Sequence, residues 1–364
     1  MNASLSISEL AASHRAASRP AHRLLIMLGM ILSVTLMSPT PRAQAQAQAT
    51  VVKLATLVPD GSVWHKVLRD MGDEWTRGTS SRVGLRIYPG GVAGDEPDMV
   101  RKMRIGQIQA AALTITGLAD IDDAFNVFAT PMLFDSYAEL FYVLDKMEPM
   151  LRQRLEAKGF VLMNWGHGGW VYFFSKQPIA TLAELKKAKM FAWAGDDRMV
   201  QSWKSSGFHP VALAATDILP GLNTGMIDLL PTTPLAANSL QWFRQVPYMA
   251  DAGLGPLVGG LVITKSAWNK ISATDRVLVE NACRKAETRL MKDVPAQDST
   301  SVREMQSRGL KVINIKPAEL QVWRKVADEF TTMMRGNIVP PDIADLALRE
   351  RNAYRALRSA GASR

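Results

Sequence analysis

Cysteine and histidine are scarce in this sequence, and their scarcity excludes two ways of holding a small protein together. Among 364 residues there are one cysteine, Cys283, and five histidines. A single cysteine cannot form an intramolecular disulfide, so the fold depends on packing. His65, His167 and His209 have no metal-ligand spacing between them and no cysteine nearby, which argues against a zinc site. The sequence predicts neither a metal nor a cofactor.

Catalytic motifs are also missing. There is no G-x-S-x-G elbow, no phosphate-binding G-x-x-x-x-G-K, and no His paired with Cys or Glu at catalytic spacing. The segment YPGGVAG, residues 88–94, is rich in glycine but precedes an acidic helix start, which would repel phosphate. These absences predict a protein that is not an enzyme.

Long hydrophobic runs are absent except near the N-terminus. There, arginines precede an apolar run from Leu24 to Met37, and the small residues of PRAQAQAQA follow. This order is typical of a secretory signal, so residues 1–47 are predicted to be a signal peptide cleaved within Ala43–Ala47. The apolar run is short for a membrane span, and an uncleaved anchor is the alternative. The mature protein is expected in the periplasm.

The composition is that of a globular protein with a basic end. The chain is 47% hydrophobic and 21% charged, with a formal net charge of +9, and it has room for two domains. Much of the positive excess lies in RERNAYRALRSAGASR from Arg349, and we set residues 351–364 apart as a basic C-terminal tail. Such a tail is typical of a solvated helix end, and nucleic acid would be an unusual partner for an exported protein. We expect a monomer that binds no nucleic acid.

The mature sequence begins with alternating strands and helices. Apolar segments at 51–58, 83–91 and from Ala110 predict strands, and helical spacing predicts a helix after each of the first two. Strands joined by helices pair in parallel through right-handed crossovers. Ligands bind beside the carboxyl ends of such strands, which indicates Pro59–Ser62 and Thr114–Gly117 as a cleft mouth.

Aromatic residues are concentrated in the stretch from Asn164 to Gly195. It predicts two extended segments around a short helix that is opened by Thr181, with Glu184 three positions later. Neighbouring side chains of a strand point to opposite faces, so one face belongs to the core and the other could hold a ligand. The aromatic residues are Trp165, Trp170, Tyr172, Phe173, Phe174, Phe191 and Trp193.

Six segments, in this order and spacing, carry a family resemblance. They are LATLVPDGSVWHK, RIYPGGVAGDEPDMVRKMRIGQIQAA, TPMLF, GGWVYFFSKQPIATLAELKKAKM, HPVAL and GLNTGMID. Over Val51–Gly336 the chain resembles periplasmic solute-binding proteins of TRAP transporters, the DctP-type family. The resemblance implies an α/β fold of two lobes, joined by crossing strands and a long helix that crosses both. It also implies that the lobes close over a small molecule and deliver it to the TRAP transporter membrane subunits.

The boundaries of the two lobes are expected at glycine-rich breaks in the strand and helix pattern. These breaks lie at Gly166–Gly169 and Gly253–Gly260. The expected division is 48–167 with 257–295 for the first lobe and 168–256 with 296–350 for the second.

The sequence departs from the resemblance at the positions that matter for acid ligands. Family members that bind organic acids carry an arginine in each of two strands, and here Trp170 and Phe191 take those places. An arginine pair suits a carboxylate because its guanidinium groups offer parallel hydrogen bonds, whereas aromatic rings favour apolar surface or a cation. We expect an uncharged, apolar or aromatic solute first, a cationic amine second and a simple carboxylate last. A swing of Arg198 or Arg244 into the cleft would restore an anion site.

Other residues are weaker candidates for ligand contact. Trp64, Trp193 and Thr116 lie at the predicted strand ends, and Asp217 takes the place of a glutamate that is often found before the late helix in this family. His167, between two glycines, could donate a hydrogen bond. For each, a structural role is the alternative, and Asp196 and Asp197 are interpreted as a helix N-cap with a solvated neighbour. A sensory binding protein that docks on a membrane kinase or chemoreceptor is the alternative function.

Overall fold

The structure is a computed structural model that describes residues 49–362, and these residues belong to one compact unit. The predicted signal peptide, residues 1–47, lies outside the described residues. Within the described part, no helix is both long and apolar enough to cross a membrane.

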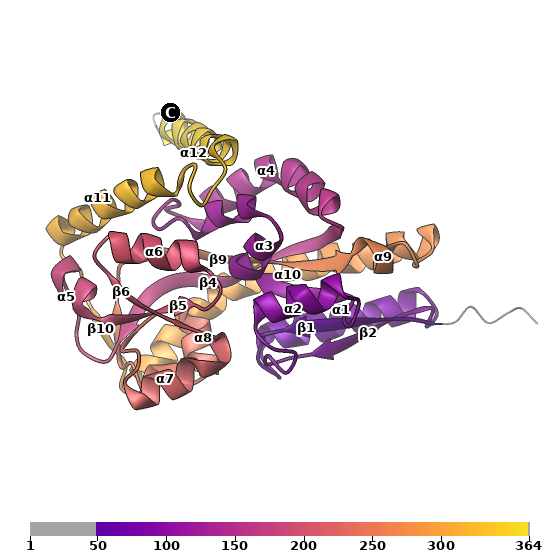
Figure 1. Cartoon of the computed structure of the whole chain (residues 1–364), viewed down its shortest axis with the longest axis horizontal. Coiled ribbons are helices and arrows are strands. Elements are labelled where there is room, and N and C mark those ends of the chain that lie inside the picture. Colours follow the sequence, from indigo (N-terminus) through magenta and orange to yellow (C-terminus); the bar gives the residue numbers. More distant parts are fainter. Residues whose placement is uncertain (1–48, 363–364) are drawn as a thin grey trace, which may run out of the picture. The chain divides into compact units, whose positions relative to one another are not determined.

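The N-terminal part forms a group of strands that we call the first strand group (Figure 1, indigo). Strands β2 and β3 flank β1 and both pair with it in parallel, as the alternation of strands and helices predicted. Ser62 opens the first helix by accepting a hydrogen bond from the His65 backbone N–H, as an N-cap does. The elements are β1 (Thr50–Thr56), α1 (Val63–Gly78), β2 (Val83–Tyr88), α2 (Glu96–Arg104), β3 (Ala110–Thr114), α3 (Ile115–Ile121) and η1 (Asp123–Ala129).

A second strand group is built from later parts of the chain. Strand β5 pairs in parallel with β6 and β7, and β8 pairs in parallel with β10. Thr181 and Glu184 form the predicted capping box at the start of α5, and Gly225 ends α7 in a left-handed conformation. The elements are α5 (Leu182–Lys187), β5 (Lys189–Trp193), α6 (Asp197–Ser205), β6 (His209–Leu213), η2 (Ala215–Asp217), α7 (Ile218–Thr224), β7 (Leu229–Thr232), α8 (Pro234–Ser239), η3 (Trp242–Arg244), β8 (Tyr248–Ala250) and β10 (Lys311–Ile313).

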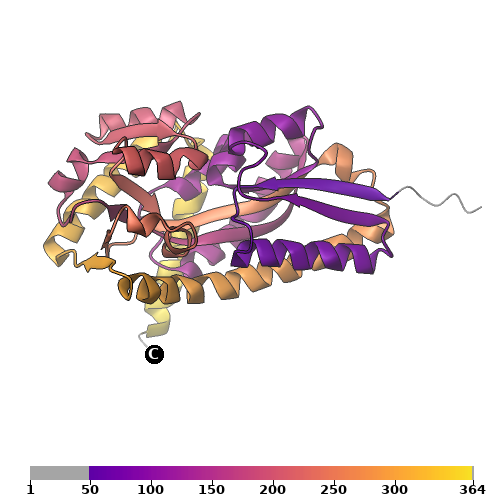
Figure 2. The same ribbon diagram turned by 90° about the horizontal axis from the view of Figure 1, so that it is seen from below.

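Three long elements run through both groups, as Figures 1 and 2 show. Strand β4 (Phe160–Ser175) pairs antiparallel with β9 (Gly255–Thr264) in its first part and with β7 and β8 in its last four residues. Helix α10 (Ala273–Gln306) packs on α1, on β4 and on α8. This mixed α/β architecture with a long crossing helix confirms the expected fold class.

The core covers both faces of the first strand group. Val52 and Leu54 of β1 pack with α1 and α10, whereas Ala55 packs on the opposite face with α2 and the helices that follow β3. Both faces therefore exclude water, and only the strand ends and the joining loops remain available for a ligand. Four further helices complete the chain: α4 (Tyr137–Ala157), α9 (Lys265–Trp268), α11 (Pro317–Met334) and α12 (Pro341–Ala362).

Strand β4 differs from the expectation at its glycines. The break expected at Gly166–Gly169 lies inside one continuous strand, which accommodates the glycines by register shifts against β9 between His167 and Trp170. Gly169 has φ +111°, a conformation that favours glycine. The expected boundary after Pro295 likewise falls within α10. The division into two lobes at these residues stays a prediction.

The basic C-terminal tail continues helix α12 and is attached to the fold. Arg355 donates hydrogen bonds to the buried carboxylate of Glu139, and the ring of Tyr354 lies 5.4 Å from that of Tyr142. The segment expected as a solvated helix end is therefore a helix that packs on α4 through part of its length.

Candidate functional site: a cleft between the strand groups

The carboxyl ends of the two strand groups meet at a narrow cleft. Asp95, which caps α2, accepts a hydrogen bond of 2.9 Å from the Ala215 backbone N–H across the cleft. Asp123 and Arg198 form a bidentate ion pair across it. A side chain at Gly91 would lie 3.0 Å from Thr216, so the loop after β2 touches the loop after β6. The structure shows the cleft in a closed arrangement.

A polar pocket lies in this cleft, between α3 and η1 on one side and the start of α6 on the other. Its volume is about 360 Å³, which is within the range of small-molecule sites. The lining residues are Pro97, Thr116, Ala119, Asp120, Asp123, Asn126, Gly195, Asp196, Asp197 and Arg198.

Glu96 fixes the turn that presents Thr116 to the pocket. Its carboxylate is fully buried and accepts hydrogen bonds of 2.8 Å from the N–H and the hydroxyl of Thr114 and from the N–H of Gly117. Burial raises the pKa of Glu96 to about 7, although these three bonds act in the other direction. The strand end of β3 and the start of α3 are therefore held by one buried side chain.

The opposite wall is the start of helix α6. Asp196 caps the helix by accepting from the Met199 backbone N–H, as predicted. Burial raises the pKa of Asp196, against the hydrogen bond from Met199 and the charge of Arg198, which lower it, while the carboxylates of Asp123 and Asp197 add a smaller increase. Gly195, with φ +94°, turns the chain so that Asp196, Asp197 and Arg198 line the pocket.

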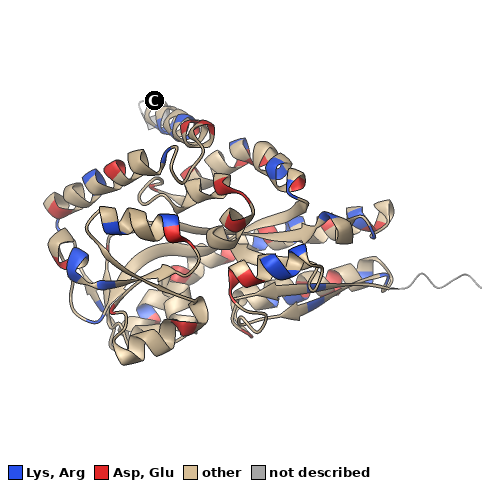
Figure 3. Cartoon of the chain, viewed as in Figure 1, with Lys and Arg blue, Asp and Glu red and all other residues tan. Residues whose placement is uncertain are grey.

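Acidic groups outnumber basic ones in this pocket. Figure 3 shows red residues at the facing ends of α2 and α3, and red beside blue at the start of α6. Four aspartates and one arginine line the pocket, and the arginine is already paired with Asp123. Asp120 lies 3.5 Å from Arg104, which is outside the lining. The pocket wall therefore carries net negative charge.

A second set of predicted residues lies where β4 crosses the molecule. The indole N–H of Trp64 donates to the carbonyl oxygen of His167 at 3.2 Å. Trp170 lies edge-on to Tyr137, with ring centroids 5.2 Å apart. The Trp170 backbone N–H donates to Asp298 of α10 at 2.7 Å.

The imidazole ring of His167 is buried and makes no hydrogen bond within residues 49–362. Its ring lies 5.0 Å from that of Tyr137 and 5.6 Å from that of Phe141, and neither ring nitrogen has a partner within the described residues. Burial lowers the pKa of His167 to about 4, so the ring is neutral at physiological pH.

Phe191, Trp193 and Asp217 lie apart from both sets. Phe191 is 4% exposed and packs in the core of the second strand group, edge-on to the half-buried Trp193. Asp217 is exposed on η2 and its side chain caps nothing. The structure thus brings Trp64, His167 and Trp170 together, places Thr116 in the polar pocket, and sets Phe191 beneath the surface. Ligand contact by these residues stays a prediction.

Sequence reasoning missed several residues of the site. Glu96, Asn126, Tyr137 and Asp298 were not singled out. Asn126 gives a signal in the sequence, because it is a lone polar residue within the apolar run AFNVFA. Such a residue, when buried, needs a partner or a function.

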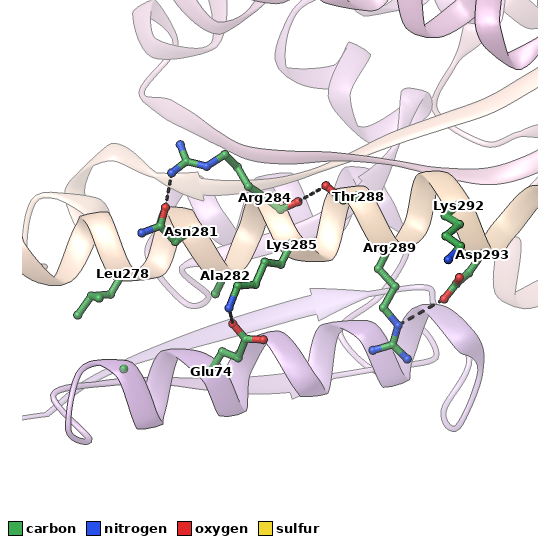
Figure 4. A pocket seen from close by; sticks show the side chains of 11 residues that line it. Glu74, Leu278, Asn281, Ala282, Arg284, Lys285, Thr288, Arg289, Lys292 and Asp293 are labelled. Atoms are coloured by element: carbon green, nitrogen blue, oxygen red, sulfur yellow. Dashed lines mark hydrogen bonds and ion pairs between the residues drawn. The ribbon is translucent and has the colours of Figure 1, made fainter.

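A larger hollow of about 840 Å³ lies elsewhere, in the groove between α1 and α10 (Figure 4). It is open to solvent, and its charges pair across the two helices: Lys285 with Glu74 at 2.9 Å and Arg289 with Asp70 at 2.5 Å. These ion pairs join two packed helices, so we interpret the groove as part of the contact between α1 and α10. The cleft remains the candidate site.

Asp298 makes the stability of the protein depend on pH. Burial raises its pKa to about 6, against the hydrogen bonds from Trp170, Leu235 and Tyr137. A carboxyl whose pKa is raised on folding stabilises the protein below its unfolded pKa, and this contribution is lost as pH rises through 6. We expect the free energy of unfolding to fall by about 2.4 kcal/mol more in the wild type than in Asp298→Asn between pH 4 and pH 7.

Denaturant unfolding of both proteins at several pH values measures this difference. The low pKa of His167 acts in the opposite direction between pH 4 and 6.5, but it is common to both proteins and cancels. Parallel stability curves for the two proteins would contradict the expectation.

The two strand groups, the crossing strands and the closed cleft define a solute-binding protein. The chain belongs to the family named bacterial extracellular solute-binding protein, family 7 (DctP), which matches residues 54–336. This match confirms the family resemblance. It also confirms the prediction that the chain is a solute receptor and not an enzyme.

Relatives support the same class. A solute-binding protein of Chromohalobacter salexigens is 24% identical over 262 residues, 71% of this chain and 76% of that protein. The ectoine/5-hydroxyectoine-binding periplasmic protein UehA of Ruegeria pomeroyi is 24% identical over 245 residues, 65% of this chain and 69% of that protein.

Solved structures share the fold. DctP7 of Bordetella pertussis, an extracytoplasmic solute receptor binding pyroglutamic acid, superposes with a TM-score of 0.77 at 21% identity, covering 84% of this chain and 100% of that one. A TRAP periplasmic solute-binding protein of Xanthobacter autotrophicus with bound β-D-galacturonate gives 0.76 at 20% identity, covering 83% and 99%.

Proposed function

We propose that this protein captures, in the periplasm, a solute that lacks a carboxylate, and that it delivers this solute to the membrane subunits of a TRAP transporter. The solute has an apolar or aromatic body. The family resemblance carries the proposal, because it implies that Trp170 and Phe191 stand at the places where acid-binding members have arginines. Arg198, which could have served instead, is bonded to Asp123.

The physical reason is the cost of dehydrating an anion. A carboxylate moved into this cleft would lose its hydration without a free cation to replace it, at a cost of several kcal/mol. Arg244 is exposed on η3, where its Nε donates to Gln241, and it is not part of the polar pocket's lining. An aromatic surface such as Trp170 instead gains about 0.5–2 kcal/mol from each stacked or edge-on contact.

A thermal-shift screen tests the solute class. We expect neutral apolar or aromatic solutes, or amines, to raise the melting temperature, and C4-dicarboxylates and 2-oxo acids to leave it unchanged. Trp170→Ala should weaken the shift, whereas Trp242→Ala, a half-buried tryptophan on η3, should keep it. Because Phe191 is buried, its alanine variant would lose about 3–5 kcal/mol of stability and would inform less about the ligand.

Stabilisation by acids in the same screen would contradict the proposed solute class. Strong stabilisation by dicarboxylates that disappears in Arg198→Ala would show that Arg198 leaves Asp123 to bind an anion. The sensory alternative stays a prediction, and neighbouring genes for permease subunits or for a sensor kinase would separate the two functions.

A further inference from the structure

The polar pocket between η1 and α6 has the chemistry of a site for a positive charge. We propose that it binds a protonated amine carried by the solute. This inference rests on the proposed function. The sequence ranked a cationic amine as the second solute class, and the pocket moves this class to first place. Its basis is the set of side chains that line the pocket, four aspartates and one arginine.

The charges within the pocket do not cancel. Arg198 neutralises Asp123 through their bidentate pair, and Arg104 lies near Asp120 from outside. Asp196 and Asp197 then remain without an ion-pair partner among the described residues. The partial positive charge at the start of α6, about half an elementary charge, is smaller than the two carboxylates beside it.

Asn126 shows that the pocket is built for a ligand. Its side chain is 3% exposed, it lines the pocket, and no hydrogen bond to its amide is found within residues 49–362. The amide is not among the side-chain atoms that are both sealed from solvent and unpaired, so its small exposed part accounts for its place in the pocket lining. A ligand group that donates to the Asn126 carbonyl oxygen would give this amide a partner.

Two further acceptors line the same pocket. The hydroxyl of Thr116 has no partner in the part of the chain that the structure describes, since only its backbone N–H is bonded. Asp196 uses one carboxyl oxygen as the helix cap and leaves the other free. An ammonium group has three donors and no acceptor, and Thr116, Asn126 and Asp196 offer three acceptors.

The acceptors come from both sides of the cleft. Thr116 and Asn126 follow β3 of the first strand group, and Asp196 follows β5 of the second. An ammonium held by all three would bind the closed form better than an open one, and only such a differential contact can shift the equilibrium. The raised pKa of Asp196 agrees, because a nearby cation would stabilise its charged form.

Matched sets of ligands test this inference by isothermal titration calorimetry. One set is phenethylamine, 2-phenylethanol and phenylacetate, and another is tryptamine, tryptophol and indole-3-acetate; within each set only the polar end differs. We expect the amine to bind at least about 10-fold more tightly than the alcohol, since a charge-assisted hydrogen bond is stronger than one between neutral groups.

Two variants localise the effect. Asp196→Asn keeps an N-cap residue of similar shape but removes the charge, and it should weaken amine binding about 10-fold while changing alcohol binding less than about 2-fold. Asp342→Asn, in the exposed first turn of α12, is the control and should change neither. Because Asp196→Asn conserves a capping side chain and Asp342 is exposed, melting temperatures close to the wild type will show that each variant is folded.

The outcomes separate this inference from the proposed function. If the alcohol binds as tightly as the amine, or if Asp196→Asn has no effect on the amine, the ammonium site is rejected and the carboxylate-free solute remains. If the acid of each set binds most tightly, both proposals are rejected. If no amine binds below about 1 mM, the ammonium site is also rejected.

Discussion

Replacing Glu96 with alanine is expected to lower the free energy of unfolding by about 3–5 kcal/mol. The Glu96 carboxylate is buried. It accepts three hydrogen bonds, from the backbone N–H and the hydroxyl of Thr114 and from the Gly117 N–H. Alanine would leave three donors without partners and a cavity beside them, and each unpaired buried donor costs about 1–3 kcal/mol. Because the turn that carries Thr116 would loosen, ligand affinity should fall as well.

Asp98 provides a matched control on the same helix turn. It is half-exposed and pairs only with Arg101, so Asp98→Ala should cost at most about 1 kcal/mol. Both residues lie in the first turn of α2 and lose a similar interaction with the helix dipole, so their difference reports the buried bonds. Urea unfolding measures both variants, and equal losses would show that the Glu96 bonds contribute little.

Replacing Gly169 with alanine is expected to destabilise the protein by more than about 3 kcal/mol. Two costs add. The backbone at Gly169 has φ +111°, which other residues rarely adopt, and an added Cβ would lie 2.4 Å from the Asp298 carboxylate. Asp298 would have to move away from the N–H groups of Trp170 and Leu235 and from the Tyr137 hydroxyl.

Gly159 separates these two costs. It also has a positive φ, +86°, but an added Cβ there would meet nothing within 4 Å. Gly159→Ala should therefore cost only the backbone strain, about 1–2 kcal/mol. A loss in Gly169→Ala no larger than that in Gly159→Ala would mean that Asp298 shifts without penalty, and that its hydrogen bonds are not essential.

Local features of the fold could be predicted from sequence because neighbours along the chain determine them. The N-cap at Ser62 and the capping box of Thr181 and Glu184 depend on residues three positions apart, and the structure contains both. The parallel pairing of β1 with its neighbours follows from the helices that join them.

Features that depend on distant parts of the chain could not be predicted in the same way. The glycines of β4 suggested a break, but partners on β9, almost a hundred residues later in the sequence, hold the strand together. Nor does a sequence show that Glu96 is buried, because an acidic residue at a helix start is usually a solvated one. Its burial results from packing against the turn after β3.

The same limit applies to the site. The alternation of a strand places Phe191 and Trp193 on one face, and the structure finds their rings 5.5 Å apart. Periodicity does not tell which face is the core, and Phe191 is buried in it. The polar pocket was harder still, because Thr116, Asn126 and Asp196 come together only when the two strand groups face each other.

The shift in register of β4 has a mechanical consequence. Between His167 and Trp170 the ladder with β9 is interrupted, so the strand can bend there with less loss of hydrogen bonding than where the ladder is continuous. Helix α10 has its own weak point at Pro295, which has no N–H to donate, one turn from Asp298. Since Asp298 bonds to Trp170, the two interruptions lie side by side. A bend at this level would therefore break fewer hydrogen bonds of β4 and α10 than a bend within an uninterrupted part of either element.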